Sequence, residues 1–212
     1  MEEIPDLNIF MMCSSLNKDA LSLLPKGYYV RSMREEELDI WASMPFDDQE
    51  TSKEYHSFMM EFFKTVYGGK EKLFFQNTLF VCDEQDQPVA TCLLWMAYEK
   101  FQTIHWFKVL KSHEGKGIGR ALLSIIMKEV PNNEYPVYLH TQPGSYRAIK
   151  LYSDFGFHLL TDETIGTRQN DLIECLPILK KWMPLTDYNN LKTTEAPLNF
   201  KESLKSYTTL EF

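Results

Sequence analysis

The sequence predicts an α/β fold, in which strands and helices alternate along the chain. Thr103–Leu110 is rich in β-branched and aromatic residues, as strands are, and closely spaced glycines and a helical apolar pattern follow it. A second strand-like run, Tyr135–Thr141, also precedes a helical pattern. Two earlier runs of the same kind, Thr78–Asp83 and Pro88–Ala97, flank a short polar turn. We therefore expect a sheet covered by helices.

The first third of the chain is expected to begin with an extension. Residues 1–26 form this N-terminal extension, with a short helix that ends before Pro25. Tyr28–Arg31 is the first predicted strand, and Arg34–Met44 and Glu50–Tyr67 are predicted helices. The inner side of the second helix is expected to hold Phe58, Met59, Phe62 and Phe63.

The domain proper is expected to span residues 27–185. Glu84–Gln87 is the predicted turn between the strands before and after it, and residues 158–177 are expected to add two more strands. Residues 186–212 form a polar tail that packs on the domain or on a neighbouring subunit. Its expected anchors are Leu198, Phe200, Leu204 and Phe212.

The segment His113–Leu123 joins a glycine turn to the start of a helix. Ile118, Leu122, Ile125 and Ile126 recur at i, i+4, i+7 and i+8, which predicts one apolar helix face. A glycine turn between a strand and a helix directs backbone N–H groups and the positive helix end at an anion, usually a phosphate. Glycine also lets a ligand approach the backbone closely.

Two common phosphate-binding motifs do not fit this turn. A P-loop needs Ser or Thr after Gly-Lys, but Gly117 follows Lys116. A dinucleotide-binding fingerprint needs a third glycine where Arg120 or Leu122 stands, and an acidic residue at the end of the next strand, which ends in His140 and Thr141. A turn that only links a strand to a helix is the other alternative.

The spacing of Gly117 and Gly119 after a strand resembles the pyrophosphate-binding turn of the GNAT acyltransferase superfamily, which binds acetyl-coenzyme A (acetyl-CoA). Ser145–Phe157, SYRAIKLYSDFGF, resembles the second signature of the same superfamily, a helix carrying Ala and Tyr before Gly-Phe. Ala148 and Tyr152 share one helix face. The two signatures occur in the expected order, and the resemblance covers most of the chain.

The resemblance implies a GNAT-type fold, with a mixed, mostly antiparallel central sheet flanked by helices. It also implies that the two central strands, Thr103–Leu110 and Tyr135–Thr141, splay apart to admit acetyl-CoA. The turn and its flanks would hold this co-substrate without a metal. The residues assigned to it are Val109, Leu110, Glu114, Gly115, Lys116, Gly117, Ile118, Gly119, Arg120, Ser145 and Ala148.

Two positions depart from the family pattern. Glu114 stands where Arg or Gln is usual, and we expect its carboxylate to turn away from a pyrophosphate. Ser145 stands where Asn is usual, and we expect it to cap the following helix.

The resemblance also implies direct attack of a primary amine on the thioester, with Tyr152 as the acid that protonates the leaving thiolate. The competing interpretation makes Tyr152 a core aromatic. His105 is the first candidate base, because strand alternation puts it on one face with Thr103, Phe107 and Val109. Some family members, the arylalkylamine acetyltransferases among them, have histidine at a comparable point. His140 is the second candidate, and deprotonation through water is a third possibility.

Composition excludes several other classes of function. The net charge of −8 argues against nucleic acid as the main partner. The longest apolar runs are too short for a membrane span, and the acidic N-terminus lacks the basic start of a signal peptide. Four cysteines without a C-x-x-C pair argue against a metal site and favour a cytoplasmic location.

The predicted function is N-acetylation of the primary amine of a small cationic molecule. The first two helices are expected to build the acceptor side, where acids and aromatics would suit a cation, although these acids could equally form ordinary solvated helix faces. The acids are Glu35, Glu36, Glu37, Asp39, Asp47, Asp48, Glu50 and Glu54. The alternatives are a non-catalytic acyl-CoA-binding module, which the Glu114 departure favours, and a peptide or protein N-acetyltransferase. A monomer or homodimer is expected.

Overall fold

The computed structural model describes residues 4–207 and 211–212. The strands are β1 (Ile9–Cys13), β2 (Tyr28–Ser32), β3 (Thr78–Asp83), β4 (Pro88–Ala97), β5 (Phe101–Val109), β6 (Val137–Thr141), β7 (Phe157–Leu160), β8 (Thr164–Ile165), β9 (Arg168–Gln169) and β10 (Thr193–Thr194). The helices are α1 (Leu38–Ser43), α2 (Gln49–Tyr67), α3 (Glu71–Asn77), α4 (Ile118–Glu129), α5 (Tyr146–Asp154), α6 (Leu172–Trp182), α7 (Leu185–Asn189) and α8 (Leu198–Leu204).

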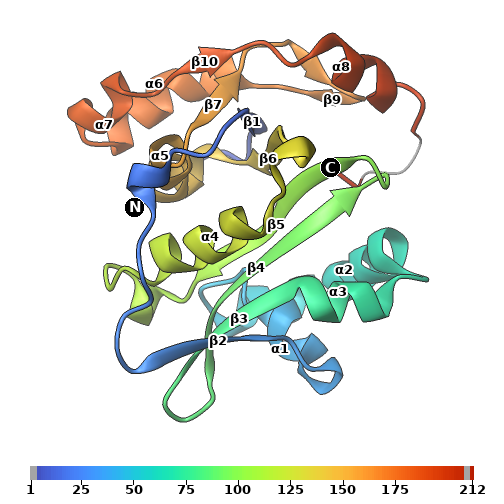
Figure 1. Ribbon diagram of the computed structural model, residues 1–212, viewed down its shortest axis with the longest axis vertical. Helices are drawn as coiled ribbons and strands as arrows, with labels where there is room; N and C mark the ends of the chain where they lie inside the picture. Colours follow the sequence, from blue (N-terminus) through green and yellow to red (C-terminus); the bar gives the residue numbers. More distant parts are fainter. Residues whose placement is uncertain (1–3, 208–210) are drawn as a thin grey trace.

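One large sheet organises the molecule (Figure 1). Its strand order is β10-β7-β1-β6-β5-β4-β3-β2, and β8 and β9 form a separate hairpin. The β5–β6 and β7–β10 pairs are parallel and the other pairs of the large sheet are antiparallel. The predicted mixed, mostly antiparallel sheet flanked by helices is therefore confirmed.

The sheet opens between β5 and β6, as expected. Within the described chain these strands pair only where Thr103 faces Tyr138 and Ile104 faces Leu139, although β5 runs on to Val109. A β-bulge lies just beyond this point, because the β4–β5 register shifts there and Trp106 has φ of +54°. A bulge bends the strand that carries it, so β5 turns away from β6.

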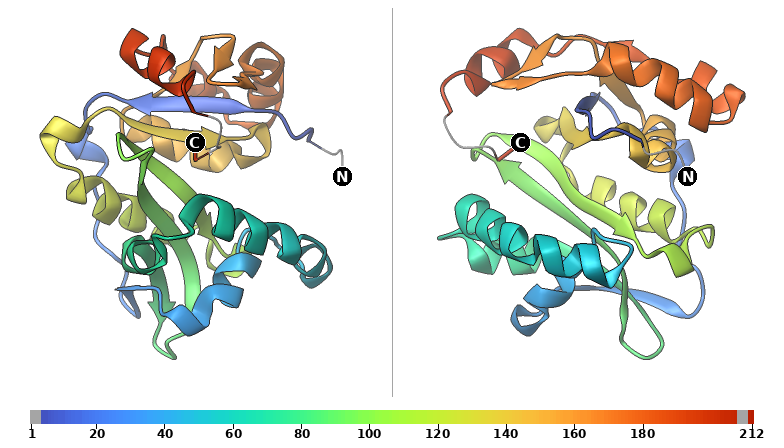
Figure 2. Two further views of the ribbon diagram at one scale, coloured as in Figure 1. Left: turned by 90° about the vertical axis from the view of Figure 1, so that its right-hand side faces the viewer. Right: turned by 180° about the vertical axis from the view of Figure 1, so that it is seen from behind.

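Helices cover the sheet unevenly (Figure 2). Helices α4, α5 and α6 contribute to the largest core, on one face. On the other face α1, α2 and α3 cover β3 and β4, whereas α8 covers β1, β6 and β7. Two groups of strands, each with its own layer of helices, thus meet at the opening.

The N-terminal segment corrects one expectation. Residues 1–26 were predicted as an extension, yet β1 lies inside the sheet, between β6 and β7. Its five residues, IFMMC, are buried on both faces, so the sequence lacks the alternation that marks a half-buried strand. In place of an α-helix before Pro25 there is one 3-10 turn, Lys18–Ala20.

The C-terminal part also differs from expectation. After β7, the segment predicted to form strands contains only the short β8–β9 hairpin. From Leu172 the chain forms helix α6. The tail packs on its own domain, since β10 extends the sheet and Phe200 stacks on Tyr138 with ring centroids 3.8 Å apart. Phe200 and Leu204 are buried as expected, but Leu198 is 66% exposed and is not an anchor.

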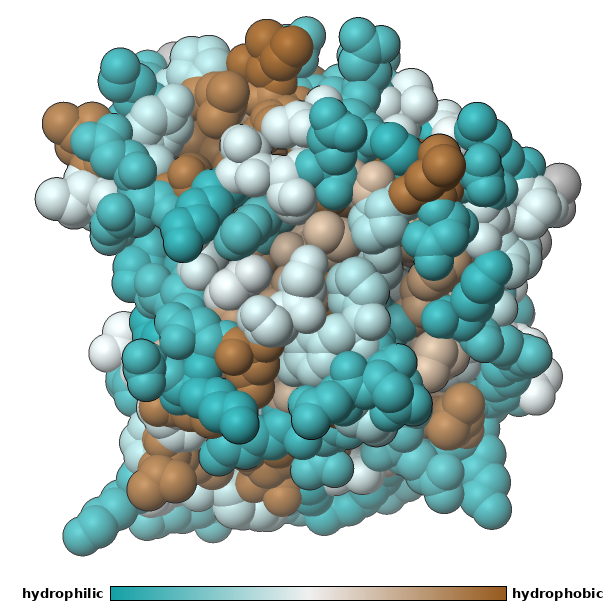
Figure 3. All heavy atoms as spheres, turned by 45° about the horizontal axis from the view of Figure 1, so that its top comes forward, coloured by the Kyte–Doolittle hydropathy of each residue, from teal (hydrophilic) through white to brown (hydrophobic). Residues whose placement is uncertain are grey.

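The surface is largely hydrophilic in the view of Figure 3, with apolar side chains in small separate groups. Ile173 and Leu185 are among the exposed large apolar residues of the described chain. Among the described residues, no helix has both the length and the apolar character that a membrane span requires.

Candidate functional site

A cavity of about 630 Å³ lies where β5 and β6 part. It brings together the three predicted catalytic side chains, His105 from β5, His140 from β6 and Tyr152 from α5. Ser145 and Ala148 also line it. His105 is far in the sequence from the other four residues, and all five meet where the two strands diverge.

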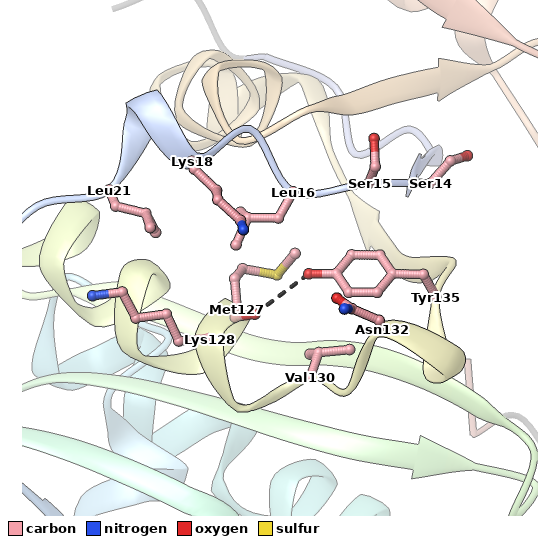
Figure 4. A pocket seen from close by; sticks show the side chains of 10 residues that line it. All are labelled: Ser14, Ser15, Leu16, Lys18, Leu21, Met127, Lys128, Val130, Asn132 and Tyr135. Carbon is pink, nitrogen blue, oxygen red and sulfur yellow. Dashed lines mark hydrogen bonds between the residues drawn. The ribbon is translucent and has the colours of Figure 1, made fainter.

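A second cavity of about 520 Å³ is shown in Figure 4. It lies between the segment that follows β1 and the end of α4, where the Tyr135 hydroxyl donates to the Met127 carbonyl at 3.4 Å. None of the predicted site residues lines it. The cavity between β5 and β6 is therefore the candidate site.

The glycine turn has the open backbone that an anion needs. Gly115 and Gly117 have φ of +75° and +83°, and Gly117 directly precedes α4. A Cβ atom on Gly115 would meet nothing within 4 Å, and one on Gly117 would meet only Pro25 Cγ, at 3.9 Å. No side chain of the described residues caps this end of α4. The turn thus fits a pyrophosphate held by backbone N–H groups.

Gly119 and Ile118, two other residues of the predicted turn, have a packing role. A Cβ atom on Gly119 would lie 3.2 Å from Phe107 Cζ and 3.3 Å from Val109 Cγ2, so this glycine lets α4 pack closely on β5. Ile118 is buried in the core beneath. At Leu110 the backbone N–H donates to the Val89 carbonyl at 2.8 Å.

The charged residues near the turn are mostly paired. Glu114 accepts from Arg147 Nη1 at 3.0 Å, which compensates the carboxylate that departs from the family pattern. Arg120 pairs with Asp154 and donates to the Ala20 carbonyl. Lys116 contacts only the His113 ring, at 3.5 Å, among the described residues. Lys116 is thus the cation of the turn that has no acidic partner among the described residues, so it can face an anionic ligand.

The start of α5 differs from the expected cap. Ser145 stands at the N-cap position, but its side chain makes no capping hydrogen bond within the described chain. It lines the cavity instead. The other end of the helix is as predicted, because Gly156 adopts φ of +99° just beyond it.

His105 is held by protein groups at both ring nitrogens. The Trp106 Nε1–H group can only donate, so Tyr67 Oη accepts from it at 3.0 Å and gives its own proton to His105 Nδ1 at 2.7 Å. Thr103 Oγ1 donates to the Trp95 carbonyl and therefore accepts from His105 Nε2 at 3.0 Å. Burial, with Arg168 nearby, lowers the pKa of His105 to about 3, which keeps the ring neutral.

The expected alignment of His105 with Phe107 and Val109 is wrong. His105 contacts Tyr67 of α2, whereas Phe107 and Val109 pack against Gly119 of α4, on the other face. The bulge at Trp106 inserts one residue and reverses the alternation.

His140 has one free ring nitrogen. Its Nε2 lies 2.9 Å from Asn8 Oδ1, an acceptor, so Nε2 carries the proton of the neutral ring. Nδ1 then has a lone pair and, among the described residues, no hydrogen-bond partner. Burial, followed by the nearby Arg168 and His105, lowers the pKa of His140 to about 3.

Tyr152 lies beneath the cavity with its ring between Phe107 and Phe157, each at 5.7 Å between centroids. The side chain is 5% exposed, and burial raises its pKa well above the usual range. No described residue hydrogen-bonds its hydroxyl, so this proton is available to a ligand in the cavity.

Arg168 and Glu211 also line the cavity, and neither was predicted from the sequence. Arg168 comes from the β8–β9 hairpin and Glu211 from the C-terminal tail. Neither stands in a motif, and no local pattern relates either residue to β5 or β6. Only the fold brings them to the site.

The acids of the first two helices do not line the cavity. Glu37 pairs with Arg31 at 2.6 Å, Asp47 pairs with Lys108 at 2.7 Å, and Asp48 caps α2. Helix α2 and the connection before it contribute an apolar wall instead, formed by Phe46, Tyr55, Phe58, Met59 and Phe62. Phe58, expected inside, is 54% exposed. The acids therefore give no support to a cationic acceptor, but the apolar wall fits a nonpolar group.

The described residues contain no group of three or more His, Cys, Asp or Glu side chains that could hold an ion.

Comparison with known families gives one match. A family model described as the acetyltransferase (GNAT) family matches residues 34–157, which is more than half of the chain. No curated protein matches the sequence.

Solved structures share the fold at low identity. A tandem GNAT protein from the clavulanic acid biosynthesis pathway matches with a TM-score of 0.54 and 12% identity, over 74% of this chain and 50% of its own. A GNAT-family acetyltransferase from Colwellia psychrerythraea matches with a TM-score of 0.50 and 13% identity, over 74% of this chain and 54% of its own. A Drosophila protein matches with a TM-score of 0.48 and 14% identity, over 74% of this chain and 49% of its own. The chain thus spans about half the length of these structures.

Proposed function

This chain belongs to the acetyltransferase (GNAT) family, and from that premise we propose that it is an N-acetyltransferase acting on the primary amine of a small molecule. The observation that carries the proposal is one cavity, next to an open glycine turn, that holds both a tyrosine hydroxyl and a histidine lone pair without protein partners among the described residues. These are the groups that amine acylation needs.

Acetyl-CoA is the proposed co-substrate, and it supplies the thioester whose carbonyl carbon takes the amine nitrogen and whose thiolate leaves. Gly115 and Gly117 present the backbone that would hold its pyrophosphate, with Lys116 as the nearby cation. The edge of β5 that faces β6 has no strand partner beyond Ile104 among the described residues. Backbone groups on that edge are therefore available to an extended ligand.

Tyr152 is the proposed general acid. Its raised pKa keeps the proton on Oη at neutral pH, the form in which the hydroxyl can donate. The hydroxyl makes no structural hydrogen bond with the described residues that it would have to break first.

His140 is the proposed general base, in preference to His105. Nδ1 of His140 is a free acceptor, whereas both nitrogens of His105 are already bonded to Tyr67 and Thr103. His105 is then a positioning residue, which links β5 to α2. Deprotonation through water remains the alternative to a histidine base.

The amine end of the acceptor is expected to arrive as an ammonium ion. Two acids line the cavity, Asp6 and Glu211, and either can face a cation there. The four unpaired cysteines support a cytoplasmic location for this enzyme, as a monomer or homodimer.

Steady-state turnover tests the proposal. Purified protein is mixed with acetyl-CoA and a panel of primary amines and short peptides; released thiol is followed by colour and the acetylated product by mass spectrometry. Acetylation of small amines supports the proposal, and acetylation of the peptides alone would show a peptide acetyltransferase. Tight acetyl-CoA binding without any acetylated product would instead identify a non-catalytic binding module.

A further inference from the structure

Arg168 is an unpaired cation in the wall of the candidate site. Its Nε and Nη2 atoms are buried and have no hydrogen-bond partner among the described residues. Every other arginine of the chain pairs with a carboxylate: Arg31 with Glu37, Arg34 and Arg31 with Asp86, Arg120 with Asp154, and Arg147 with Glu114. Arg168 alone differs, and it is the arginine that lines the cavity.

A buried guanidinium without a partner is costly. Burying a charge is unfavourable unless hydrogen bonds and an opposite charge compensate it. Burial accordingly lowers the pKa of Arg168 to about 10, which still leaves the group charged at neutral pH. A ligand with a negative, planar group would satisfy the free N–H donors.

The position of Arg168 is well defined despite this cost. Its guanidinium carbon lies 4.7 Å from the ring centroid of Phe10 and 5.9 Å from that of Phe212. Cation–π contacts of this kind hold the planar group in place. Next to β9, Asn170 Nδ2 donates to the Leu160 and Asp162 carbonyls at 2.7 and 2.9 Å and anchors the hairpin. The donors are therefore ordered in advance of a ligand.

Glu211 carries the opposite charge in the same cavity, yet it does not pair with Arg168. Its Oε2 accepts from Tyr98 N at 2.9 Å and from Trp95 Nε1 at 3.3 Å, which fixes the carboxylate at the end of β4. Arg168 and Glu211 are thus a positive and a negative group, each fixed in the cavity wall, that remain apart.

We propose that the acceptor is a small amino acid, whose carboxylate is bound by Arg168 and whose ammonium group faces Glu211. This rests on the proposed function and names its substrate class. Arginine is suited to the task, because its planar N–H groups match a carboxylate in a two-point contact. The apolar wall of Phe46, Phe58 and Phe62 fits a nonpolar side chain of the same molecule.

A carboxylate at Arg168 also has a consequence for the proposed base. After burial, the charge of Arg168 is the largest influence that lowers the pKa of His140. Compensating that charge makes His140 a better proton acceptor at the time the acceptor is bound.

Matched acceptors test the proposal. Leucine and phenylalanine are compared with isoamylamine and phenethylamine, which lack only the carboxylate, and with the two amino acid amides. We expect the amino acids to exceed the matched amines in kcat/KM by roughly 100-fold or more, because a site built to bond a group rejects analogues without it. Equal kcat/KM for amines and amino acids would overturn the carboxylate assignment while leaving the acetyltransferase function intact.

Variants of Arg168 provide the second arm. Arg168→Gln should lower kcat/KM for leucine by about 100-fold relative to kcat/KM for isoamylamine, mainly through KM, whereas Arg168→Lys should recover part of the loss. Lys205→Gln, which removes an exposed cation of the same C-terminal layer, is the matched control and should change neither.

Calorimetry separates this proposal from the proposed function. Leucine is titrated into the full chain with coenzyme A present, for the wild type and for Arg168→Gln. If leucine binds the wild type but not Arg168→Gln, the carboxylate site is supported even if no amine is acetylated. Equal binding by both proteins would overturn the site, whatever the turnover results show.

Discussion

The two sides of the candidate site are built in different ways. On the side proposed for the co-substrate, β5, the glycine turn and α4 follow one another directly in the sequence, and the turn offers mainly backbone N–H groups. On the side proposed for the acceptor, the cavity wall combines residues from both ends of the chain, among them Asp6, Phe62, Arg168 and Glu211. There the side chains determine the charge and the shape of the cavity.

This difference explains which residues a sequence motif can reveal. A backbone site needs glycines at fixed spacing beside a helix start, so it leaves a compact signature. A side-chain site needs only that particular groups meet in space, so any element can contribute one. The predictions below test this contrast, from the largest expected effect to the smallest.

The two histidines give the largest expected contrast. His140→Gln should lower kcat/KM by about 10²–10⁴-fold, because it removes the free lone pair of the proposed base. His105→Gln should cost less activity but more stability, about 1–3 kcal/mol, since it disrupts two bonded partners. Steady-state kinetics and thermal unfolding are measured on both variants. The reverse pattern would assign the base to His105, and small kinetic losses in both would favour relay through water.

Tyr152→Phe tests the residue that lies between the two sides. We expect kcat and kcat/KM to fall together by roughly 10- to 1000-fold, with acetyl-CoA affinity nearly unchanged, because the hydroxyl would act mainly in the transition state. Thermal stability should change little, since no described residue bonds the hydroxyl. A variant with wild-type turnover would make Tyr152 a packing residue only.

Gly117→Val tests the backbone site. A β-branched residue is strained at φ of +83° and would obstruct the N-terminus of α4, so acetyl-CoA binding should weaken more than tenfold, about 1.4 kcal/mol or more. Gly69→Val is the matched control, because Gly69 has φ of +80°, open space around it and no place in the cavity. Calorimetry that finds unchanged affinity in Gly117→Val would contradict the assignment of the turn.

Mild acid should destabilise the protein through the two buried histidines of the cavity. His105 and His140 have folded-state pKa values of about 3, below the ordinary 6.5, so below pH 6.5 the unfolded chain binds protons that the native state does not. The contribution of these two histidines to the free energy of unfolding is thus fully present above pH 6.5. It is lost as the pH falls toward 3, by up to about 1.4 kcal/mol per pH unit for each histidine. Denaturant unfolding of the wild type and of a His105→Gln/His140→Gln double variant should show a flatter pH profile for the variant. Identical profiles would contradict the neutral, buried state of these rings.

Lys116→Ala should have the smallest effect. An exposed charge near a pyrophosphate contributes about 0.2–1 kcal/mol at low salt, and the difference should fade as salt shortens the screening length. Acetyl-CoA affinity is measured at two ionic strengths, with Lys205→Ala as the control. A loss as large as that of Gly117→Val would mean that side-chain charge, and not backbone, holds the co-substrate.

Much of the fold could be predicted from residues that are close in sequence. Helix α2 begins and ends within one residue of the prediction, and the β3–β4 hairpin and the glycine turn lie where expected. The missed elements have ambiguous local patterns. The five residues of β1 are apolar without alternation. The range 158–177, predicted to hold two strands, overlaps α6, whose buried residues Leu172, Cys175 and Leu179 recur at helical spacing.

The sequence by itself determined the family through its two signatures, and the resemblance to that family implied the opened sheet. The sequence also located the glycine turn, the proposed pyrophosphate site, because glycine conformation, helix start and strand composition act over a few residues. The order of the strands, with β1 between β6 and β7, was decided by tertiary structure.

Tertiary structure also decided which side chains share the site. The bulge at Trp106 turned His105 toward α2, and the fold brought His140, Arg168 and Glu211 to one cavity from three separate segments. Charge and hydrogen-bonding partners act through space, so their effect on these groups depends on neighbours that sequence spacing does not specify.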